Sequence, residues 1–275
     1  MVGRLAFAAS CWLALAACGR VGFGGESDRG IGVDSGGPGG DGALVADSMV
    51  PVAGLVAQWG FDEGTGQIVN ASPGMSGVLG TSAAVDASDP QWETTASRIC
   101  TGSGLTFDGV DDIVTISGPS TPDLTQFTIT FSMYATGAGG GQLPRILTKE
   151  DGGVADTIVH FRSIDNAIAI NMFDTSGTLY ATFGGAVVLD QRANWAVAYD
   201  DAGDRRVHIY QNGVEGSYLR QDTMTGTLRA TDQAWEIGDQ ATLVRAFDGT
   251  LDEVRVYDRV LAPAEIAALS AMCPP

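Results

Sequence analysis

Short runs in which apolar and polar residues alternate dominate the chain from residue 55 onward. Residues 127–133 (Phe-Thr-Ile-Thr-Phe-Ser-Met) alternate strictly, as expected of a half-buried strand, and residues 195–199 and 207–210 repeat the pattern. Asn212-Gly213 follows the last of these runs and is typical of a tight hairpin turn. We expect further strands over residues 55–61, 105–107, 113–116, 145–148, 157–162, 167–173, 178–183, 235–238 and 251–257.

Many short strands separated by turn residues predict an all-β fold, an antiparallel sandwich of two sheets. One short helix is expected over residues 263–271, with Pro263 in its first turn and with Ile266 and Leu269 on one side. We see no internal repeat.

The first residues differ in composition from the rest of the chain. Residues 1–17 carry one cation, Arg4, and then an apolar stretch about half as long as the roughly 20 residues that cross a bilayer, so a removable signal is expected. The end of this stretch, Leu15-Ala16-Ala17-Cys18, resembles the lipobox of bacterial lipoproteins, in which the cysteine is lipidated. An ordinary secretory signal with a chance cysteine is the alternative. Both interpretations predict export.

The chain therefore divides into three segments: a signal peptide over residues 1–18, a tether over 19–50 and a globular domain over 51–275. The tether is rich in glycine and acidic residues and cannot bury enough apolar surface to fold. We expect the lipid on Cys18 to be the only membrane attachment. Gly19 is not the aspartate that keeps some lipoproteins at the inner membrane, so the outer membrane is the expected location in the cell envelope.

Composition narrows the possible partners. The 275 residues include 15 basic and 33 acidic side chains, a formal charge of −18 that disfavours nucleic acid and anionic lipid. With 44% hydrophobic residues and 17% charged ones, the chain can form one sizeable core. We expect a monomer.

Four cysteines are present. Cys11 leaves with the signal and Cys18 is committed to lipid, which leaves Cys100 and Cys273 in an oxidising compartment. We predict a Cys100–Cys273 disulfide, because no further Cys or His stands at the spacing of a zinc or redox site.

The strand segments, in their order, resemble the laminin-G-like jelly-roll domains of the concanavalin A-like lectin/glucanase superfamily. The residues that carry the resemblance span about residues 53–272 and are 55–66 (LVAQWGFDEGTG), 105–112 (LTFDGVDD), 127–134, 195–200, 207–214 and 247–257 (FDGTLDEVRVY). The resemblance implies a jelly-roll sandwich whose first and last strands lie side by side. It implies no single activity, because lectins, adhesins and glycoside hydrolases share this fold.

The strand over residues 251–257 also suggests a metal site. Asp252 shares the parity of Val254 and Val256, so we expect its carboxylate to point inward, where it needs a cation or several donors. The resemblance implies a structural calcium ion that links the N-terminal segment to this strand. By position, Asp62 or Glu63 would contribute with Asp252, together with carbonyl groups near Gly109. The alternative is that Asp252 caps a turn.

A second acidic segment contains Asp108, Asp111 and Asp112. Asp-Gly followed by Asp-Asp is interpreted first as a turn and only secondarily as a metal site.

For ligand binding we expect exposed aromatic and polar side chains. His208 and Tyr210 have the parity opposite to Val207 and Ile209 and are expected on the outward or concave side, and Tyr180 and Trp92 are further candidates. Trp59, Trp195 and Tyr199 are expected in the core, and neither His160 nor His208 has a motif partner.

Catalysis is not expected. The chain has no Glu-x-Asp-x-x-Glu strand, which in related hydrolases sets two carboxylates on one face, and no Gly-x-Ser-x-Gly, His-Glu-x-x-His or phosphate-loop motif. The sequence therefore predicts a lipid-anchored module that binds a glycan or a surface protein. A structural or adhesive protein without a small ligand is the alternative, and a divergent glycoside hydrolase is a third.

Overall fold

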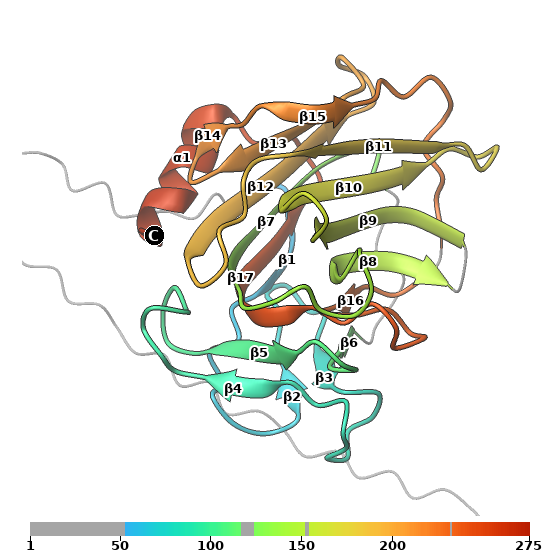
Figure 1. The fold of residues 1–275 in the computed structure, drawn as a ribbon. Coiled ribbons are helices and arrows are strands. Elements are labelled where there is room, and N and C mark those ends of the chain that lie inside the picture. The colour runs from blue at the N-terminus through green and yellow to red at the C-terminus, as the bar shows by residue number, and fades with distance from the viewer. Residues whose placement is uncertain (1–52, 117–123, 152–153, 232) are drawn as a thin grey trace, which may run out of the picture. The chain divides into compact units, whose positions relative to one another are not determined.

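The computed structural model describes residues 53–116, 124–151, 154–231 and 233–275. The predicted signal peptide and tether lie outside the described residues. The predicted all-β sandwich is confirmed: two antiparallel sheets pack face to face, and one helix lies beside them (Figure 1). None of the described residues forms a helix that is long and apolar enough to cross a membrane.

Sheet A has eight strands, of which seven follow the spatial order β14-β13-β12-β7-β17-β5-β4, with β1 paired to β17. The strands are β1 (Leu55–Trp59), β4 (Gln91–Glu93), β5 (Gly104–Asp108), β7 (Gln126–Ala135), β12 (Arg192–Asp200), β13 (Val207–Gln211), β14 (Val214–Glu215) and β17 (Asp248–Tyr257).

Sheet B has nine strands in the order β15-β11-β10-β9-β8-β16-β6-β3-β2. They are β2 (Ile68–Val69), β3 (Gly77–Leu79), β6 (Val114–Ile116), β8 (Arg145–Asp151), β9 (Val154–Arg162), β10 (Ala167–Phe173), β11 (Leu179–Gly184), β15 (Tyr218–Gln221) and β16 (Glu236–Ile237). The predicted strands appear within a few residues of their expected bounds, and β2, β3, β4, β14 and β15 are additional.

The first and last strands lie side by side, as the resemblance implied. β1 and β17 run antiparallel, with Leu55 opposite Tyr257 and Trp59 opposite Val254. Trp59 is fully buried, and its indole N–H donates to the carbonyl of Met75 at 2.8 Å. The main core lies between the sheets, where the side chains of Trp195 and Tyr199 also pack as expected.

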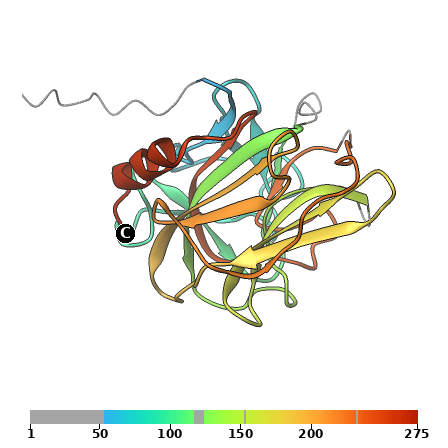
Figure 2. The same cartoon turned by 90° about the horizontal axis from the view of Figure 1, so that it is seen from above.

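The helix α1 (Pro263–Met272) covers the outer face of sheet A (Figures 1 and 2). Its Ile266 and Leu269 pack against Ala196 and Ala198 of β12 and against Tyr257. Glu265 closes the first turn by accepting the N–H of Ala262 at 2.8 Å. A second, smaller apolar cluster therefore lies on the face of sheet A that points away from sheet B.

The Asn212-Gly213 hairpin joins β13 to β14 as predicted. Both residues have positive φ, 50° and 81°, which the mirror-image hairpin turn requires. A Cβ atom on Gly213 would also lie 2.8 Å from the Cα atom of Ala267 in α1. This position therefore needs glycine for its conformation and for the close approach of the helix.

Candidate functional site

A hollow of about 160 Å³ opens where β12 ends and β13 begins. Asp200, the last residue of β12, and Asp204, from the turn before β13, line it together with His208, Tyr210 and the exposed Val260. We call it the β12–β13 hollow. It brings together His208 and Tyr210, two of the three predicted ligand-binding residues.

Two carboxylates hold His208 in place. Its Nε2 lies 3.1 Å from Asp204 and its Nδ1 lies 2.7 Å from Glu215, whose Oε1 also accepts the Tyr218 hydroxyl at 2.6 Å. Burial by itself lowers the pKa of His208, but the hydrogen bonds to Glu215 and Asp204 outweigh it and raise the pKa. The side chain is 34% exposed, which leaves one edge of the ring to the hollow.

Tyr210 is less accessible than its parity predicts. It is only 8% exposed, because α1 covers the outer face of sheet A and packs against the ring. Tyr210 does face away from sheet B as expected, but the expectation that its side chain is open to solvent is wrong. Tyr210 still lines the β12–β13 hollow, so part of the side chain borders open space.

Tyr180 lies elsewhere. It stands directly opposite Met172 in the β10–β11 ladder, so it shares the core-facing side of sheet B. Its hydroxyl donates to Asp174 at 3.2 Å and lies 2.9 Å from the Thr225 hydroxyl. Trp92 is half-buried, and its indole N–H donates to the carbonyl of Gly66.

Asp252 is fully buried, but the prediction that it shares the inward face of Val254 is wrong. Leu251 and Val254 both belong to the core between the sheets, so the side-chain alternation is broken between them. A bulge at Glu253, with φ 53°, accounts for the break, and Asp252 pairs with Ser132 on the outer face of sheet A. Burial raises the pKa of Asp252 to about 7, and one of its oxygens, Oδ1, has no hydrogen-bond partner.

The residues of the predicted calcium site are only partly brought together. Asp252 accepts the N–H of Cys100 at 2.6 Å, and Asp62 accepts the N–H of Ser103 at 3.3 Å, so both carboxylates reach the segment 100–103. Glu63 turns instead toward Asn70, whose backbone N–H it accepts at 2.7 Å.

Gly109 lies outside this group. It follows Asp108, which pairs with Asp248 at the start of β17. Asp252 is four residues further along that strand, about 13 Å away at the usual rise per residue. Gly109 is therefore at the opposite end of the β5–β17 pair, and its carbonyl cannot join Asp62 and Asp252 around one ion.

The predicted disulfide is present. Cys100 and Cys273 are bonded with their Cα atoms 5.1 Å apart. The disulfide attaches the end of α1 to residues 100–103, whose backbone N–H groups bind the carboxylates of Asp62 and Asp252. Arg192 donates to the Sγ atom of Cys273 and to the carbonyl of Pro274.

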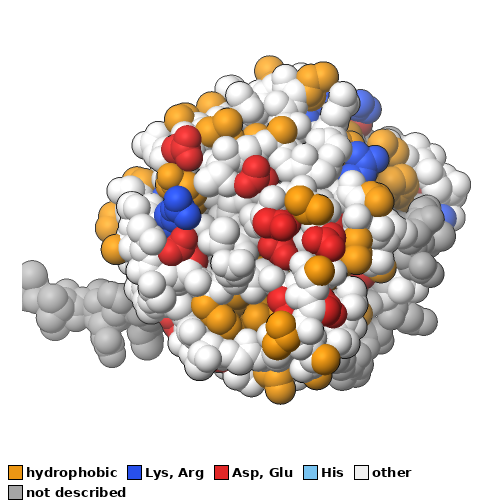
Figure 3. Space-filling model, turned by 60° about the horizontal axis from the view of Figure 1, so that its bottom comes forward, with side chains coloured by type: hydrophobic (Ala, Val, Ile, Leu, Met, Phe, Trp, Pro, Cys, Tyr) orange, Lys and Arg blue, Asp and Glu red, His pale blue; other side chains and the backbone are white. Residues whose placement is uncertain are grey.

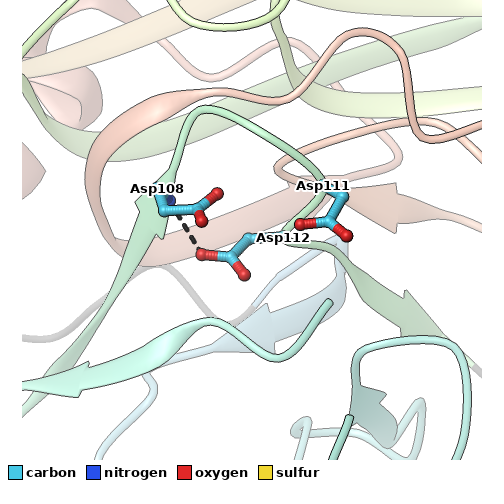
Figure 4. A group of neighbouring side chains, drawn as sticks. All are labelled: Asp108, Asp111 and Asp112. Atoms are coloured by element: carbon cyan, nitrogen blue, oxygen red, sulfur yellow. Dashed lines mark hydrogen bonds between the residues drawn. The ribbon is translucent and has the colours of Figure 1, made fainter. Parts of the chain in front are cut away.

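The loop between β5 and β6 forms the turn that the sequence predicts at Asp108 and Gly109. Asp108 accepts the N–H of Val110 at 2.8 Å, and Gly109 has φ 77°. The loop also gathers its three carboxylates: ligand atoms of Asp108, Asp111 and Asp112 all lie within 4.8 Å of one another (Figure 4). Among the described residues, no other group of three or more acidic, His or Cys side chains is as close.

Several site residues could not be found by motif. Asp200 and Asp204 are common turn residues, and only the fold places them beside His208. Glu215 reaches His208 because β14 pairs with β13 after the Asn-Gly turn, which is the one signal in the sequence that could have placed it.

The fold is an antiparallel β-sandwich of two sheets with one helix on an outer face. A family model described as the concanavalin A-like lectin/glucanases superfamily matches residues 108–267, more than half of the chain, so the protein belongs to this superfamily. No curated protein matches the sequence.

Solved structures with the same fold include binding domains and enzymes. The binding domain of Paraclostridial Mosquitocidal Protein 1 aligns with a TM-score of 0.60 and 12% identity over 79% of this chain and 52% of that one. This chain therefore spans about half of that relative. Domain 4 of AbnA, an arabinanase from Geobacillus stearothermophilus solved with arabinotriose, aligns with a TM-score of 0.56 and 15% identity over 81% of this chain and 99% of that one. A Trypanosoma rangeli sialidase aligns with a TM-score of 0.53 and 17% identity over 80% of this chain and 33% of that one.

Proposed function

We propose that this protein is a non-catalytic carbohydrate-binding module that holds a neutral glycan in the β12–β13 hollow. The observation that carries the proposal is the convergence in one hollow of an aromatic residue, a histidine and two carboxylates, Asp200 and Asp204. Ligand sites commonly combine an apolar wall with a few fixed polar groups. Membership of the concanavalin A-like lectin/glucanases superfamily and a neighbour solved with arabinotriose support the choice of ligand class.

The chemistry of the hollow favours neutral sugars. Carboxylate oxygens accept hydrogen bonds from sugar hydroxyl groups, and such charge-assisted bonds are stronger than neutral ones. The exposed side chain of Val260 supplies apolar surface for the C–H face of a sugar. The carboxylates of Asp200 and Asp204 line the hollow, and the chain has a net charge of −18, so an acidic sugar would be repelled.

Glycan-array screening of the whole chain, followed by calorimetry with the best neutral oligosaccharides and with arabinotriose, tests the proposal. Asp204→Asn removes a carboxylate charge from the hollow and His208→Ala removes a wall, and both are expected to weaken binding at least tenfold. Tyr180→Phe is the control, because Tyr180 lies outside the hollow. Full binding by Asp204→Asn and His208→Ala, with loss in Tyr180→Phe, would move the site to sheet B.

The same screen separates the other candidate functions. A structural or adhesive surface protein would bind no oligosaccharide on the array. A divergent hydrolase would release reducing sugar from polysaccharides, and the two carboxylates of the hollow would then be the first residues to replace.

We further propose that the module is exported and attached to the outer membrane by a lipid on Cys18. The lipobox-like sequence that ends at Cys18 supports this proposal. Cys18→Ser is expected to remove the protein from the detergent phase in a phase-partitioning assay. Cys11→Ser, the same change within the signal, is the control and should partition like the wild type. Equal partitioning of the two variants would argue against lipidation.

A further inference from the structure

Lys149 is the only lysine among the 15 basic residues of the chain, and it is buried in β8. Figure 3 shows acidic and basic side chains spread over the surface of one face of the molecule. Lys149, in contrast, is 2% exposed. Lysine is one of the residues that proteins bury least, and a buried lysine is normally paired.

Lys149 is paired with Asp156 of β9. Its Nζ lies 3.2 Å from Oδ2 of Asp156, and the two side chains are 3% and 8% exposed. Lys149 stands opposite Thr157 and Glu150 stands opposite Ala155, so Asp156 is an extra residue in its strand. Such a bulge redirects a side chain. Asp156 therefore lies with Lys149 on the wall of one cavity.

This cavity has a volume of about 100 Å³ and is lined by residues of both sheets. Phe127 and Ile129 of β7 belong to its wall and are buried in the core, and the exposed Ala230 lies at its rim. Apolar surroundings disfavour charged groups relative to neutral ones. Burial accordingly raises the pKa of Asp156, although the charge of Lys149 opposes the shift. A larger share of Asp156 is therefore a neutral carboxylic acid than in water.

Two other largely buried ion pairs of the described residues use arginine. Arg145 pairs with Glu150 at 2.7 Å, and Arg255 pairs with Glu253. Arginine suits a buried pair because its guanidinium is weakly hydrated and binds a carboxylate through two hydrogen bonds. A guanidinium stays protonated, however, whereas a buried lysine can lose a proton and become a nucleophile. The single lysine of the chain therefore stands where an amine has a use that arginine cannot provide.

We propose that the side chains of Lys149 and Asp156 join through an amide bond, which cross-links β8 to β9. Lys149 passes one proton to the carboxylate, and its neutral Nζ then attacks Cγ of Asp156. A C–N bond forms and the bond from Cγ to Oδ1 breaks. Oδ1 leaves as one water molecule, with the transferred proton and a second proton from the nitrogen. The reaction needs no oxidant, reductant or further reactant.

The contacts of Asp156 assign a role to each of its oxygens. Oδ2 accepts the hydroxyl of Thr231 at 3.1 Å, and a donor at the oxygen that stays stabilises the negative charge that develops there during attack. Oδ1 is buried and has no hydrogen-bond partner, so its departure breaks no contact. Nζ is 3.2 Å from Oδ2, so Cγ is at most about 4.4 Å from Nζ. A small rotation brings the two atoms to the roughly 3–3.5 Å of a reactive arrangement.

The cross-link also removes an unfavourable feature of the core. Two buried charges become one neutral amide, and a charge is far more costly to bury than an amide. The released water can leave past Ala230 at the rim of the cavity. The cavity shares no residue with the β12–β13 hollow, so the proposal does not depend on glycan binding.

Tryptic digestion of the unfolded whole chain, followed by mass spectrometry, tests the proposal. Trypsin cleaves after lysine and arginine, so the segment between Arg145 and Arg162 stays whole only if Lys149 is blocked. We expect an uncut peptide of residues 146–162 that is lighter by one water. An amine-reactive label added in denaturant should leave this peptide unmodified, because the peptide contains the only lysine of the chain.

Lys149→Arg is the matched control, because it keeps a positive charge beside Asp156 and cannot form the amide. Its segment 146–162 should be cut after residue 149, and the fragments should add up to the full mass. In Asp156→Ala, Lys149 should take up one label and be cut by trypsin.

Two results would overturn the proposal. One is a wild-type segment 146–162 that is cut after Lys149 and keeps its full mass. The other is a segment that lacks one water but is still cut after Lys149, which would assign the loss to an aspartate that cyclises onto its own backbone. The wild-type digest decides the question even if Asp156→Ala does not fold.

Discussion

The chain contains only two histidines, and their surroundings shift their pKa values in opposite directions. His160 is 2% exposed on β9, where burial, with a further contribution from the charge of Arg145, lowers its pKa to about 3. His208 lies between Asp204 and Glu215, whose hydrogen bonds raise its pKa despite partial burial. The imidazole C–H resonances of the whole chain should therefore show one ring that titrates above pH 6.5 and one that does not titrate between pH 5 and 8.

The buried ring also makes stability depend on pH. His160 is neutral in the folded protein, but in the unfolded chain it binds a proton as the pH falls below about 6.5. The unfolded state then holds more protons, so the contribution of His160 to the free energy of unfolding falls as the pH falls from 6.5 toward 3. Between pH 7 and pH 5 the loss is about 2 kcal/mol, from 1.36 kcal/mol per pKa unit over about 1.5 units.

Other groups act in the opposite direction, so the effect has to be isolated. The raised pKa values of Asp112 and Asp252, both about 7, stabilise the folded protein as the pH falls. Urea unfolding of the wild type and of His160→Gln at pH 7 and at pH 5 separates these contributions, because the carboxylates are common to both proteins. Between pH 7 and pH 5, the free energy of unfolding of the wild type should fall by about 2 kcal/mol relative to that of the variant.

Two results would refute this reasoning. Two imidazole rings that both titrate near 6.5 would mean that His160 is exposed to solvent. Parallel pH profiles for the wild type and His160→Gln would mean that protonation of His160 does not contribute to acid destabilisation.

Three further outcomes follow from the packing. Replacing both Cys100 and Cys273 by serine should lower the free energy of urea unfolding by up to about 5 kcal/mol, because the disulfide closes a loop with a sequence separation of 173; an unchanged midpoint would contradict this. Gly213→Ala should cost about 1–3 kcal/mol in thermal unfolding through its positive φ and its contact with α1, whereas Gly216→Ala, whose Cβ would meet no atom closer than 3.6 Å, should cost much less. Leu269→Ala should cost about 2–5 kcal/mol in urea unfolding, because Leu269 packs α1 onto sheet A; a loss below 1 kcal/mol would argue against that packing.

The longer strands and the helix could be predicted because their patterns extend over enough residues to show a period. β7 and β12 alternate over nine or ten residues, and Pro263 marks the start of α1. β2 and β14 have two residues each, which is too short for any alternation, and they exist only because a longer neighbour pairs with them.

The candidate sites show a different limit. The turn at Asp108 is local and could be predicted, but the pairing of β16 with β6, which sets Glu236 opposite Thr115, could not. A pairing of two residues between segments more than 100 positions apart leaves no pattern in a single sequence.

Two wrong expectations about sheet A, an accessible Tyr210 and an Asp252 that shares the face of Val254, have related physical causes. The first assumed that the outer face of the sheet is open, as is common in antiparallel sheets, and the second assumed that the alternation along β17 is unbroken. Here α1 covers the outer face of β12 and β13, and the bulge at Glu253 turns Asp252 onto that same covered face.

The residues of β12 carry a signal for this second layer. In Trp195-Ala196-Val197-Ala198-Tyr199 the positions that face away from sheet B are alanines, not charged side chains, and both are at most 2% exposed. Small residues at alternate positions of a central strand are what a closely packed helix requires, since larger side chains would hold it away. The alternation thus encodes two packed faces: large residues toward sheet B and small ones toward α1.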